Sequence, residues 1–375
     1  MIKYRAMKSR RLKLPFAIDR SDRRTLVTQM TDGLRKAIAD GFYPVGSVIP
    51  SWRELAEACG VSERVPREAT SWLIDDGLLE AKRRVGTRVL PKGASVWRSH
   101  VLVIDREGSE LSFYINAMLA AIQQRLCQAG HFISRITLPL LSEGQWDVRP
   151  LDMILRSRFD LAIVHTGHLP TIHKLNMAKI PYFIHKGAKS RSPMQIAALH
   201  YDYRAALRSF IRHCSRCRIR SVLAVGYPFD QVHAVKALRK SGVAASTLRI
   251  PESDRHRQTY LYDLMQKSMA AMDGWLDAER KLPDLIYFTD DYVAMGAFVS
   301  LLDRNVEIPE SVRVVTLSNR GFLPVFKKQP TRFEIDPFGF GEKIGNAITD
   351  FLSGKTVPTE ITHPISYITG ETFPG

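Results

Sequence analysis

Apolar positions near the start of the chain recur with a helical period. Between residues 24 and 40 they fall every three or four residues, and Gly41 then ends the pattern. Further along, Ser51 stands three residues before Glu54, which is the spacing of a capping box in which the serine caps a helix and the glutamate reaches back to the cap. The pattern therefore predicts a first helix within 24–40 and a second helix from Ser51 to about Gly60.

A third helix and a hairpin are predicted next. Ser62 offers a second N-cap, and the helix that it begins would end near Gly77. The buried face of this helix would consist of Val65, Ala69, Trp72 and Leu73. Two short helices joined by the sequence CGV predict a helix–turn–helix. The segment LLEAKRRVGTRVL at 78–90 is apolar at both ends and basic in the middle, so it predicts a β-hairpin with a basic tip.

Such a unit is typical of proteins that bind duplex DNA. Its third helix would enter the major groove, while the hairpin would lie along the phosphate backbone or touch the minor groove. The alternative is a winged-helix fold that is used for protein contacts. We favour DNA because the arginines of this unit cluster where phosphates would lie.

The rest of the chain alternates between short apolar runs and helical stretches. Nine β-rich runs begin with HVLVID and end with RVVTLSN. Strands that alternate with helices predict a parallel sheet covered by helices on both faces, and two such halves can flank a cleft. Ligands of open parallel sheets bind beyond the carboxyl ends of the strands. The polar residues at these ends are Asp105, His165, His185, Asp202, Tyr227, Asp290, Asp291 and Asn319.

The charge distribution strengthens the DNA interpretation. The 375 residues carry a formal net charge of +16, with 19 Lys/Arg against 11 Asp/Glu in residues 1–97 and 35 against 27 afterwards, so each part carries +8. The first quarter of the chain therefore has nearly three times the positive charge density of the rest, as a polyanion-binding module would. The arm before residue 25 adds nine Lys/Arg against two Asp. This arm is either a solvated tail or a sequence-neutral phosphate contact.

Composition also indicates the cellular setting. The four cysteines are too few and too clustered for a disulfide framework, which points to a reducing compartment. Only the short apolar run LPFAI follows the basic N-terminal residues, so no signal-peptide core is expected, and no other apolar run reaches membrane-spanning length. We therefore expect a cytoplasmic protein without a membrane partner.

The chemical motifs point away from catalysis. Cys214 and Cys217 form a C-x-x-C beside His213, which could bind zinc or exchange thiols, but no second pair accompanies them and we expect structural cysteines. No H-E-x-x-H, serine-triad or P-loop pattern is present. Asp290 and Asp291 are adjacent and would point in different directions, which favours ligand hydrogen bonding over shared-proton chemistry. No enzyme activity, metal ion or cofactor is expected.

Residues 25–90 resemble the winged helix–turn–helix of GntR-type bacterial transcription regulators. The resemblance rests on PSWRELAEACGVSERVPREA and on DDGLLEAKRRVGTRV, which follow each other in the family's order and spacing. It implies DNA contacts from the start of the second helix, from the third helix and from the wing. With the arginines that adjoin these positions, the expected DNA-binding residues are Ser51, Arg53, Arg64, Arg67, Arg84, Gly86 and Thr87.

Three positions depart from the GntR pattern. Glu63 stands where the family usually has an arginine, so this carboxylate either accepts from a cytosine amino group or points away from the phosphates. Pro66 near the start of the third helix would remove at most one backbone hydrogen bond, so we expect the helix to form. Arg84 replaces the first of two wing glycines and adds charge to the tip. The family's base preference is therefore not carried over to this chain.

From about residue 99 onward the chain resembles the effector-binding domain of LacI/GalR-type regulators, which is related to periplasmic sugar-binding proteins. Residues 282–319, LPDLIYFTDDYVAMGAFVSLLDRNVEIPESVRVVTLSN, match the family's strand, acidic turn, helix and following strand in order. The resemblance implies two lobes with a small molecule between them, mostly a sugar or a nucleobase. The effector-binding residues expected from it and from the strand ends are Ser112, Tyr114, Asp202, Tyr203, Tyr227, Asp291, Ser318 and Asn319.

Two departures affect the expected ligand. Ser318 stands where the family usually has a carboxylate that holds a sugar hydroxyl, and Ala205 stands where an arginine often follows the position of Asp202. We therefore expect a polar small molecule in general. A sugar is favoured because the tyrosines among the expected contacts could stack on a pyranose face.

The expected organisation has four parts: a basic arm at 1–24, a winged helix–turn–helix at 25–90, a linker at 91–99 and a two-lobed α/β domain with parallel sheets at 100–375. This organisation predicts a ligand-responsive transcription regulator, a repressor that binds a double-stranded operator as a homodimer. The alternative is a solute-binding or sugar-modifying protein whose basic domain only attaches it to another molecule.

Overall fold

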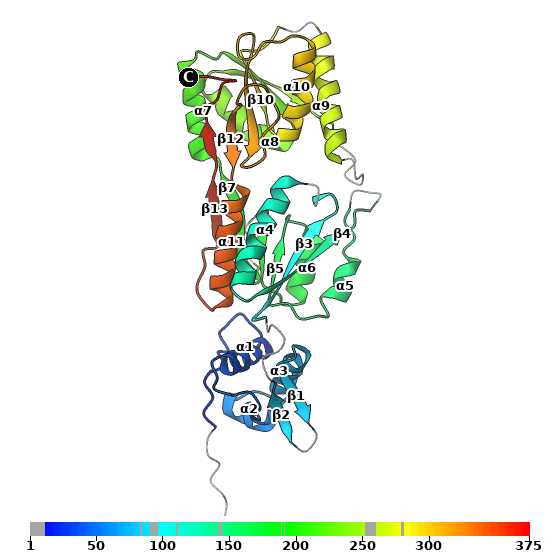
Figure 1. The fold of residues 1–375 in the computed structure, drawn as a ribbon, viewed down its shortest axis with the longest axis vertical. Coiled ribbons are helices and arrows are strands. Elements are labelled where there is room, and N and C mark those ends of the chain that lie inside the picture. Colours follow the sequence, from blue (N-terminus) through cyan, green and yellow to red (C-terminus); the bar gives the residue numbers. More distant parts are fainter. Residues whose placement is uncertain are drawn as a thin grey trace, which may run out of the picture.

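In the computed structural model the chain forms three bodies that follow one another along its longest axis (Figure 1). The structure describes residues 12–82, 85–90, 97–109, 112–141, 145–188, 190, 192–251, 260–278 and 281–375. Residues 1–11 of the predicted basic arm, Arg84 in the wing and residues 91–96 of the predicted linker lie outside the described residues. The three bodies are a winged helix, a near lobe that adjoins it and a far lobe at the other end.

The winged helix has the elements that the sequence predicts. Its helices and hairpin strands are α1 (Leu26–Ala39), α2 (Trp52–Cys59), α3 (Arg64–Asp75), β1 (Leu79–Lys82) and β2 (Gly86–Val89). The capping box is confirmed, because the Ser51 hydroxyl accepts from the Glu54 amide and the Glu54 carboxylate accepts from the Ser51 amide. Gly60 ends α2 with a left-handed φ of 63°, a conformation that favours glycine. Leu34, Leu55 and Leu73 are fully buried in the core of this domain.

The start of α3 differs from the prediction at Ser62. The helix begins at Arg64, no side chain caps it, and its N-cap residue Glu63 already has helical dihedral angles. The Val65 amide donates to the Ser62 backbone carbonyl instead. A tightened first turn thus satisfies this backbone amide, which the Ser62 hydroxyl was expected to cap. Pro66 lies in this first turn and is buried, and the helix forms around it as predicted.

The near lobe is a six-stranded parallel sheet in the order β13-β7-β6-β5-β3-β4. Its strands are β3 (His100–Arg106), β4 (Phe132–Leu138), β5 (Leu161–Val164), β6 (Tyr182–His185), β7 (Gln195–Asp202) and β13 (Glu360–Pro364). Its helices are α4 (Phe113–Gln128), α5 (Arg149–Ile154), α6 (Leu169–Met177) and α11 (Pro337–Leu352). The two longest of these helices, α4 and α11, pack together at close range, since a Cβ on Gly341 would lie 2.4 Å from the Met118 carbonyl oxygen.

The far lobe repeats this plan with the order β14-β12-β11-β10-β8-β9. Its strands are β8 (Ser221–Gly226), β9 (Ala244–Arg249), β10 (Leu285–Phe288), β11 (Arg313–Asn319), β12 (Thr331–Ile335) and β14 (Ser366–Ile368). Its helices are α7 (Arg204–Arg216), α8 (Pro228–Lys240), α9 (Tyr260–Asp277) and α10 (Asp291–Asp303). The predicted alternation of strand and helix is interrupted where β6 leads into β7, β11 into β12 and β13 into β14 without a helix. In addition, β14 pairs with β12 in the antiparallel direction.

The chain crosses between the lobes three times. It passes from β7 into α7, from β12 into α11 and from β13 into β14. One buried hydrophobic cluster is continuous across these crossings, and it includes Ile122 and Phe340 of the near lobe and Phe210 and Phe333 of the far lobe. The lobes are therefore joined by a common core as well as by three crossing segments of the polypeptide.

The winged helix contacts the near lobe mainly through one arginine, Arg158. The Arg158 guanidinium lies 4.7 Å from the centre of the Trp72 ring in α3 and forms ion pairs with Asp32 of α1 at 3.2 Å and with Asp160 of its own lobe at 2.9 Å. Trp72, which the helical period assigned to the buried face, is half-buried beneath this arginine. From the opposite direction, Arg35 of α1 donates to the Arg98 carbonyl and to Asp76.

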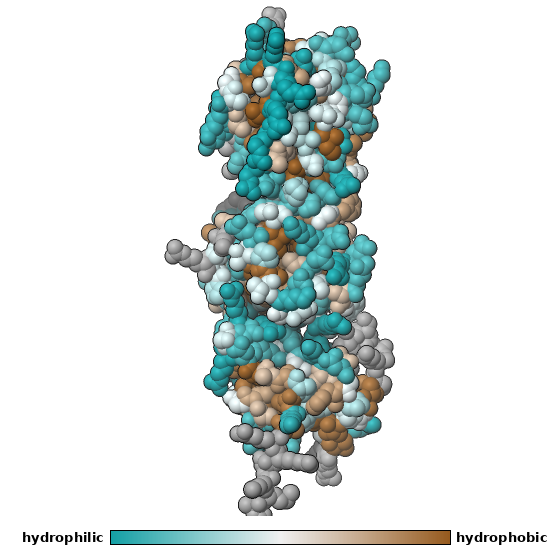
Figure 2. All heavy atoms as spheres, turned by 90° about the vertical axis from the view of Figure 1, so that its left-hand side faces the viewer, coloured by the Kyte–Doolittle hydropathy of each residue, from teal (hydrophilic) through white to brown (hydrophobic). Residues whose placement is uncertain are grey.

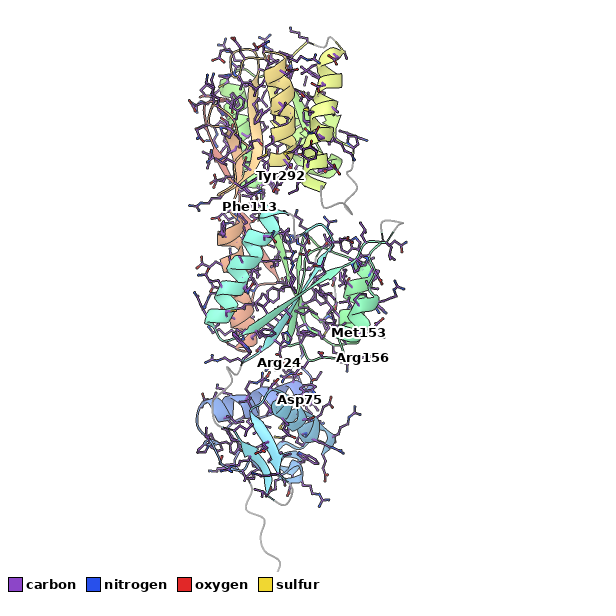
Figure 3. The ribbon with its side chains drawn as sticks, turned by 45° about the vertical axis from the view of Figure 1, so that its right-hand side comes forward. Arg24, Asp75, Phe113, Met153, Arg156 and Tyr292 are labelled. Carbon is purple, nitrogen blue, oxygen red and sulfur yellow. The ribbon has the colours of Figure 1, made fainter. Side chains whose placement is uncertain are left out.

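Replacing Arg158 with alanine should loosen the winged helix from the near lobe. The change removes a cation–π contact and the ion pairs of a side chain that is only 15% exposed, which together are worth roughly 1–3 kcal/mol. We expect a single calorimetric unfolding transition in the wild type to divide into two in the variant. Arg156→Ala is the matched control because Arg156 is exposed beside the same boundary (Figure 3). Equal thermograms for both variants would contradict this coupling.

Candidate functional site

The winged helix gathers six of the seven predicted DNA-binding residues around one hollow. The hollow has a volume of about 880 Å³ and lies between the start of α2, the start of α3 and the wing. The predicted residues that line it are Ser51, Arg53, Arg64, Arg67, Gly86 and Thr87. Gly86 has a φ of 106°, and a Cβ there would lie 2.8 Å from a Val48 methyl group. The close approach of the wing to the segment before α2 therefore requires glycine at this position.

The three arginines of the hollow are held at its mouth by weak contacts. Arg53 forms an ion pair with Glu63 at 3.6 Å, and both side chains are more than half exposed. Arg67 lies 5.4 Å from the centre of the Trp52 ring, which is itself fixed by a 2.9 Å hydrogen bond to Thr70. Exposed ion pairs are worth at most about 1 kcal/mol, so an incoming phosphate can displace them at little cost. Glu63 was expected either to accept from a cytosine amino group or to point away from the phosphates, and in the structure its carboxylate pairs with Arg53.

The second site is a cleft of about 340 Å³ between the two lobes. Much of its wall consists of residues at or directly after strand ends that occur in pairs two positions apart, because alternate side chains of an extended segment face the same side. These pairs are Tyr201 with Tyr203, Tyr287 with Thr289, Leu317 with Asn319, and Phe333 with Ile335. Ser112, Tyr114 and Lys186 of the near lobe face them, and Asp290, Asp291 and Tyr292 complete the far side.

The start of α10 supplies the acidic side of the cleft. The Asp290 carboxylate caps the helix by accepting from the Tyr292 and Val293 amides. Asp291 is buried, and its carboxylate accepts from the Asn319 side chain at 2.7 Å. Burial raises the pKa of Asp291 to about 7, and the charge of Asp290 acts in the same direction. The buried Asn319 Oδ1 and Thr289 Oγ1 atoms have no hydrogen-bond partner among the described residues, so this wall holds two polar atoms whose hydrogen-bonding capacity is unused.

A buried polar chain supports the near-lobe side of the cleft. The Tyr114 hydroxyl lies 2.7 Å from His185 Nε2, and His185 Nδ1 lies 3.0 Å from His165 Nδ1. Burial lowers the pKa of His165 to about 3 and also lowers that of His185, so both rings are neutral. In the bond between two neutral imidazoles one ring donates and the other accepts. If His185 Nδ1 accepts, its Nε2–H donates to Tyr114; if His185 Nδ1 donates, its Nε2 accepts from the Tyr114 hydroxyl. These two hydrogen bonds therefore hold the Tyr114 ring in a defined position at the cleft.

The structure separates the predicted effector-binding residues into two groups. Ser112, Tyr114, Tyr203, Asp291 and Asn319 line the cleft, and Tyr227 lines an adjoining hollow of about 140 Å³. Asp202 and Ser318 do not line either space. Asp202 forms an ion pair with Arg204 at 2.8 Å, and Ser318 is fully buried on the opposite face of its strand from its neighbours. Of each neighbouring pair that was expected, the structure therefore places Tyr203 and Asn319 at the cleft and leaves Asp202 and Ser318 away from it.

Several cleft residues were missed by the sequence reasoning. Tyr201, Tyr287 and Thr289 follow from the alternation of side chains on strands whose ends were already predicted. Lys186 comes from the loop after β6, where its φ of 53° is left-handed, and His233 comes from α8. No local pattern marks these two residues, because only the packing of the lobes brings them to the cleft.

The remaining candidate chemistry lies apart from both sites. Cys214 is buried in α7, where burial raises the pKa of its thiol to about 12, and Cys217 directly follows that helix. Within the part of the chain that the structure describes, no group of three or more His, Cys, Asp or Glu side chains could hold a metal ion. Over the same ranges, every helix is too short or too polar to cross a lipid bilayer.

The raised pKa of Asp291 predicts a pH-dependent stability. A carboxyl group that binds its proton more tightly in the folded state stabilises that state most when it is protonated. The contribution of Asp291 to the free energy of unfolding should therefore be largest below about pH 4 and should fall as the pH rises to about 7, by up to about 4 kcal/mol. Asp291→Asn should remove this fall, so that the variant is more stable than the wild type at alkaline pH.

Denaturant unfolding across this pH range measures the effect. Asp303→Asn, an exposed carboxylate at the other end of α10, is the matched control and should follow the wild-type profile. Parallel profiles for the wild type and the Asp291 variant would mean that Asp291 has an ordinary pKa.

Two family models match separate parts of the chain. The model described as bacterial regulatory proteins, gntR family, matches residues 26–89, and the periplasmic binding protein-like domain matches residues 231–373. Catabolite control protein A of Priestia megaterium is 22% identical over 219 residues, which cover 56% of this chain and 63% of that protein. The HTH-type transcriptional regulator YieP of Escherichia coli is 36% identical over 63 residues, 17% of this chain and 27% of that protein. The chain thus spans less than two thirds of the length of the curated relatives that it matches.

Solved structures share the fold of the two lobes. The lac repressor dimer bound to operator and an anti-inducer aligns with a TM-score of 0.58 at 13% identity, over 74% of this chain and 94% of that one. A LacI family regulator from Enterococcus faecium with bound ribose aligns with a TM-score of 0.59 at 15% identity, over 73% of this chain and 98% of that one. The chain therefore combines a GntR-type winged helix–turn–helix with a periplasmic-binding-protein-like domain that has the fold of LacI-type regulators.

Proposed function

We propose that this protein is a transcription regulator that binds an operator in duplex DNA through its winged helix and responds to a small polar effector in the interlobe cleft. The observation that carries the proposal is the hollow of the winged helix, where three exposed arginines meet the wing at the place expected to face phosphates. The second site on the same chain, with its buried acceptors, supplies a means of control.

The response to effector is proposed to run through closure of the lobes. Phe322 of the far lobe stacks on Phe113 of the near lobe, with ring centres 5.2 Å apart, and lies 5.3 Å from the Tyr292 ring. Phe113 and Tyr292 face each other across the boundary of the lobes in Figure 3. A ligand that contacts both walls would favour one arrangement of this boundary. Because Arg158 joins the near lobe to the winged helix, that arrangement would change the placement of the DNA-binding surface.

The effector class that fits the cleft best is a sugar or a similar polyhydroxylated molecule. Tyrosine rings supply flat apolar faces, while Asp291 and Asn319 supply acceptors for hydroxyl groups. The ribose in the Enterococcus faecium structure supports this class, since that protein has the same two-lobed fold. A cavity of about 340 Å³ has room for a molecule of that size.

We further propose a cytoplasmic homodimer that acts as a repressor. The location follows from the operator, which a protein must reach in the cytoplasm. Exposed apolar side chains lie on the paired helices α9 and α10, at Tyr262, Val299 and Leu302, and they would be covered by a second copy. The lac repressor structure is such a dimer on its operator. Two winged helices related by a two-fold axis match a palindromic site.

Replacing Arg67 with alanine should weaken operator binding without unfolding the chain. Fluorescence anisotropy with an operator selected from a random duplex library measures the affinity at several salt concentrations. A lost phosphate contact lowers affinity equally on all sequences and reduces the salt slope by about one, whereas a lost base contact relaxes specificity. Lys36→Ala is the control, because Lys36 is exposed in α1 of the same domain and does not line the hollow. Unchanged binding by the Arg67 variant would remove α3 from the DNA interface.

A thermal-shift screen of sugars and related metabolites should identify the effector, since a ligand at a hundred times its dissociation constant stabilises the protein by about 2.7 kcal/mol.

Asp291→Ala should then cost about 1.5–3 kcal/mol of effector affinity, roughly ten- to a hundredfold. Ser318→Ala should bind normally because Ser318 does not line the cleft. The reverse result would place the effector on the other face of β11. An effector that leaves operator affinity unchanged would favour a solute-binding protein over a regulator.

A further inference from the structure

The far lobe carries a concentration of arginines that neither proposed site uses. Residues 204–220, which comprise α7 and the loop that leads to β8, contain six arginines and no carboxylate. One face of α7 is committed to the core, where Phe210 and Cys214 are fully buried. The arginines therefore project from the remaining faces of the helix.

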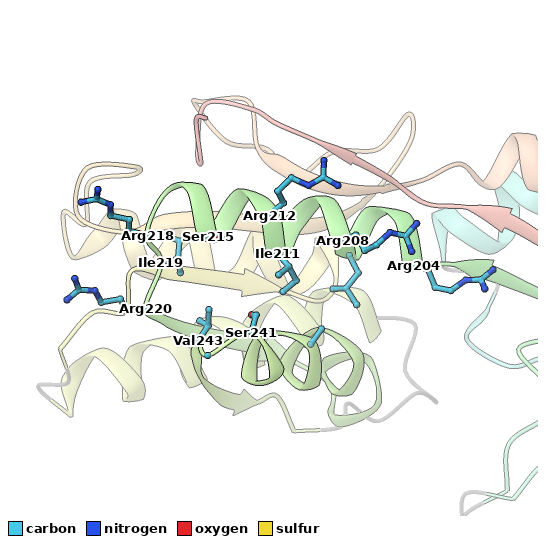
Figure 4. A pocket seen from close by; sticks show the side chains of 13 residues that line it. Arg204, Arg208, Ile211, Arg212, Ser215, Arg218, Ile219, Arg220, Ser241 and Val243 are labelled. Atoms are coloured by element: carbon cyan, nitrogen blue, oxygen red, sulfur yellow. The ribbon is translucent and has the colours of Figure 1, made fainter.

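Five of these arginines border a groove of about 930 Å³ between α7 and α8, shown in Figure 4. The apolar side chains that line the groove are Leu207, Ile211, Ile219, Ala237 and Val243. The arginines on its border are Arg204, Arg208, Arg212, Arg218 and Arg220. Figure 2 views the molecule from the α7 side and shows hydrophilic side chains running across the far lobe beside apolar patches. The groove thus joins an apolar floor to a strongly cationic border.

Most of this positive charge is not neutralised within the chain. Arg204 forms an ion pair with Asp202 at 2.8 Å. Among the described residues, no carboxylate forms an ion pair with Arg208, Arg212, Arg218 or Arg220. Like charges four residues apart destabilise a helix, so the row along α7 does not contribute to folding. An anionic partner would relieve this repulsion.

The apolar floor distinguishes among anionic partners. Phosphate groups of a nucleic acid would use the arginines but would leave the floor exposed to water. The groove also lies at the opposite end of the molecule from the winged helix, so an operator held there would not reach it (Figure 1). A single small anion would engage only part of a groove that follows a 13-residue helix, a length of about 20 Å. A protein segment with both acidic and apolar side chains uses the whole surface.

We propose that the α7–α8 groove is a docking site for an acidic amphipathic helix of another protein. Arg204, Arg208 and Arg212 are spaced four residues apart, about 6 Å along α7. Carboxylates four residues apart on a partner helix have the same spacing, and its apolar stripe would cover the floor. Arginine suits this role because its planar group can donate two hydrogen bonds to one carboxylate. The groove meets the interlobe cleft at Leu207, which lines both, but none of its five arginines lines the cleft, so the proposal does not depend on the function proposed above.

The test uses the full-length protein and a labelled helical peptide of about 16 residues, with glutamates four positions apart along one edge and leucines along the adjacent stripe. Fluorescence anisotropy measures binding, and a scrambled peptide of the same composition is the first control. Arg208→Gln with Arg212→Gln should weaken binding of the patterned peptide at least about fivefold, the effect of losing two exposed charge pairs. Arg216→Gln with Arg249→Gln removes the same charge from exposed arginines outside the groove, and it should leave binding unchanged.

Each other outcome overturns the proposal. Equal binding of the scrambled peptide, or equal losses in both double variants, would mean that net charge alone attracts the peptide. No binding at about 100 μM peptide would mean that the groove is not a helix site. Displacement of the patterned peptide by duplex DNA in an Arg67→Ala background would assign the surface to nucleic acid. A change of oligomeric state in Arg208→Gln with Arg212→Gln, seen by light scattering, would assign it to a second copy of this chain.

Discussion

Parallel hydrogen bonding within the two sheets is the constraint on which the arrangement of this protein depends. Parallel strands must be joined by crossovers, so in each lobe all strands that share a direction also end at the same edge. The two lobes present these edges to each other, and the loops that follow β3, β6, β10 and β11 meet there. Chemistry collects between the lobes because that is where the carboxyl ends of the strands lie.

Much of this arrangement could be predicted from the sequence, because it depends on local periodicity. The capping box, the glycine at the end of α2 and the alternation of strand and helix all reflect interactions between residues a few positions apart. The strand ends that form the cleft were located correctly for the same reason. The sequence did not indicate which of two neighbouring side chains faces the cleft. Tyr203 and Asn319 line it, whereas Asp202 and Ser318, one position away, do not. A resemblance locates a strand, but a shift of one residue places a side chain on the other face.

Other parts depend on contacts between residues far apart in the chain, and no pattern in the sequence indicates them. Arg158 follows a short helix in a basic stretch and resembles any solvated arginine, yet it contacts Asp32, which precedes it by 126 residues. Lys186 and His233 reach the cleft only because the two lobes face each other. The basic character of residues 204–220 was visible in the sequence, but the apolar floor beside it required the packing of α7 on α8.

The three crossings between the lobes also affect the order in which the parts can fold during synthesis. The winged helix completes its core with Val89, so it can fold as soon as the first quarter of the chain has emerged. The near lobe is built from two separated segments, and its sheet and its α4–α11 pair remain incomplete until β13 has been made, after nearly all of the far lobe. During translation there is thus an interval in which the winged helix can be folded while the lobe on which it rests still lacks its last helix and edge strand.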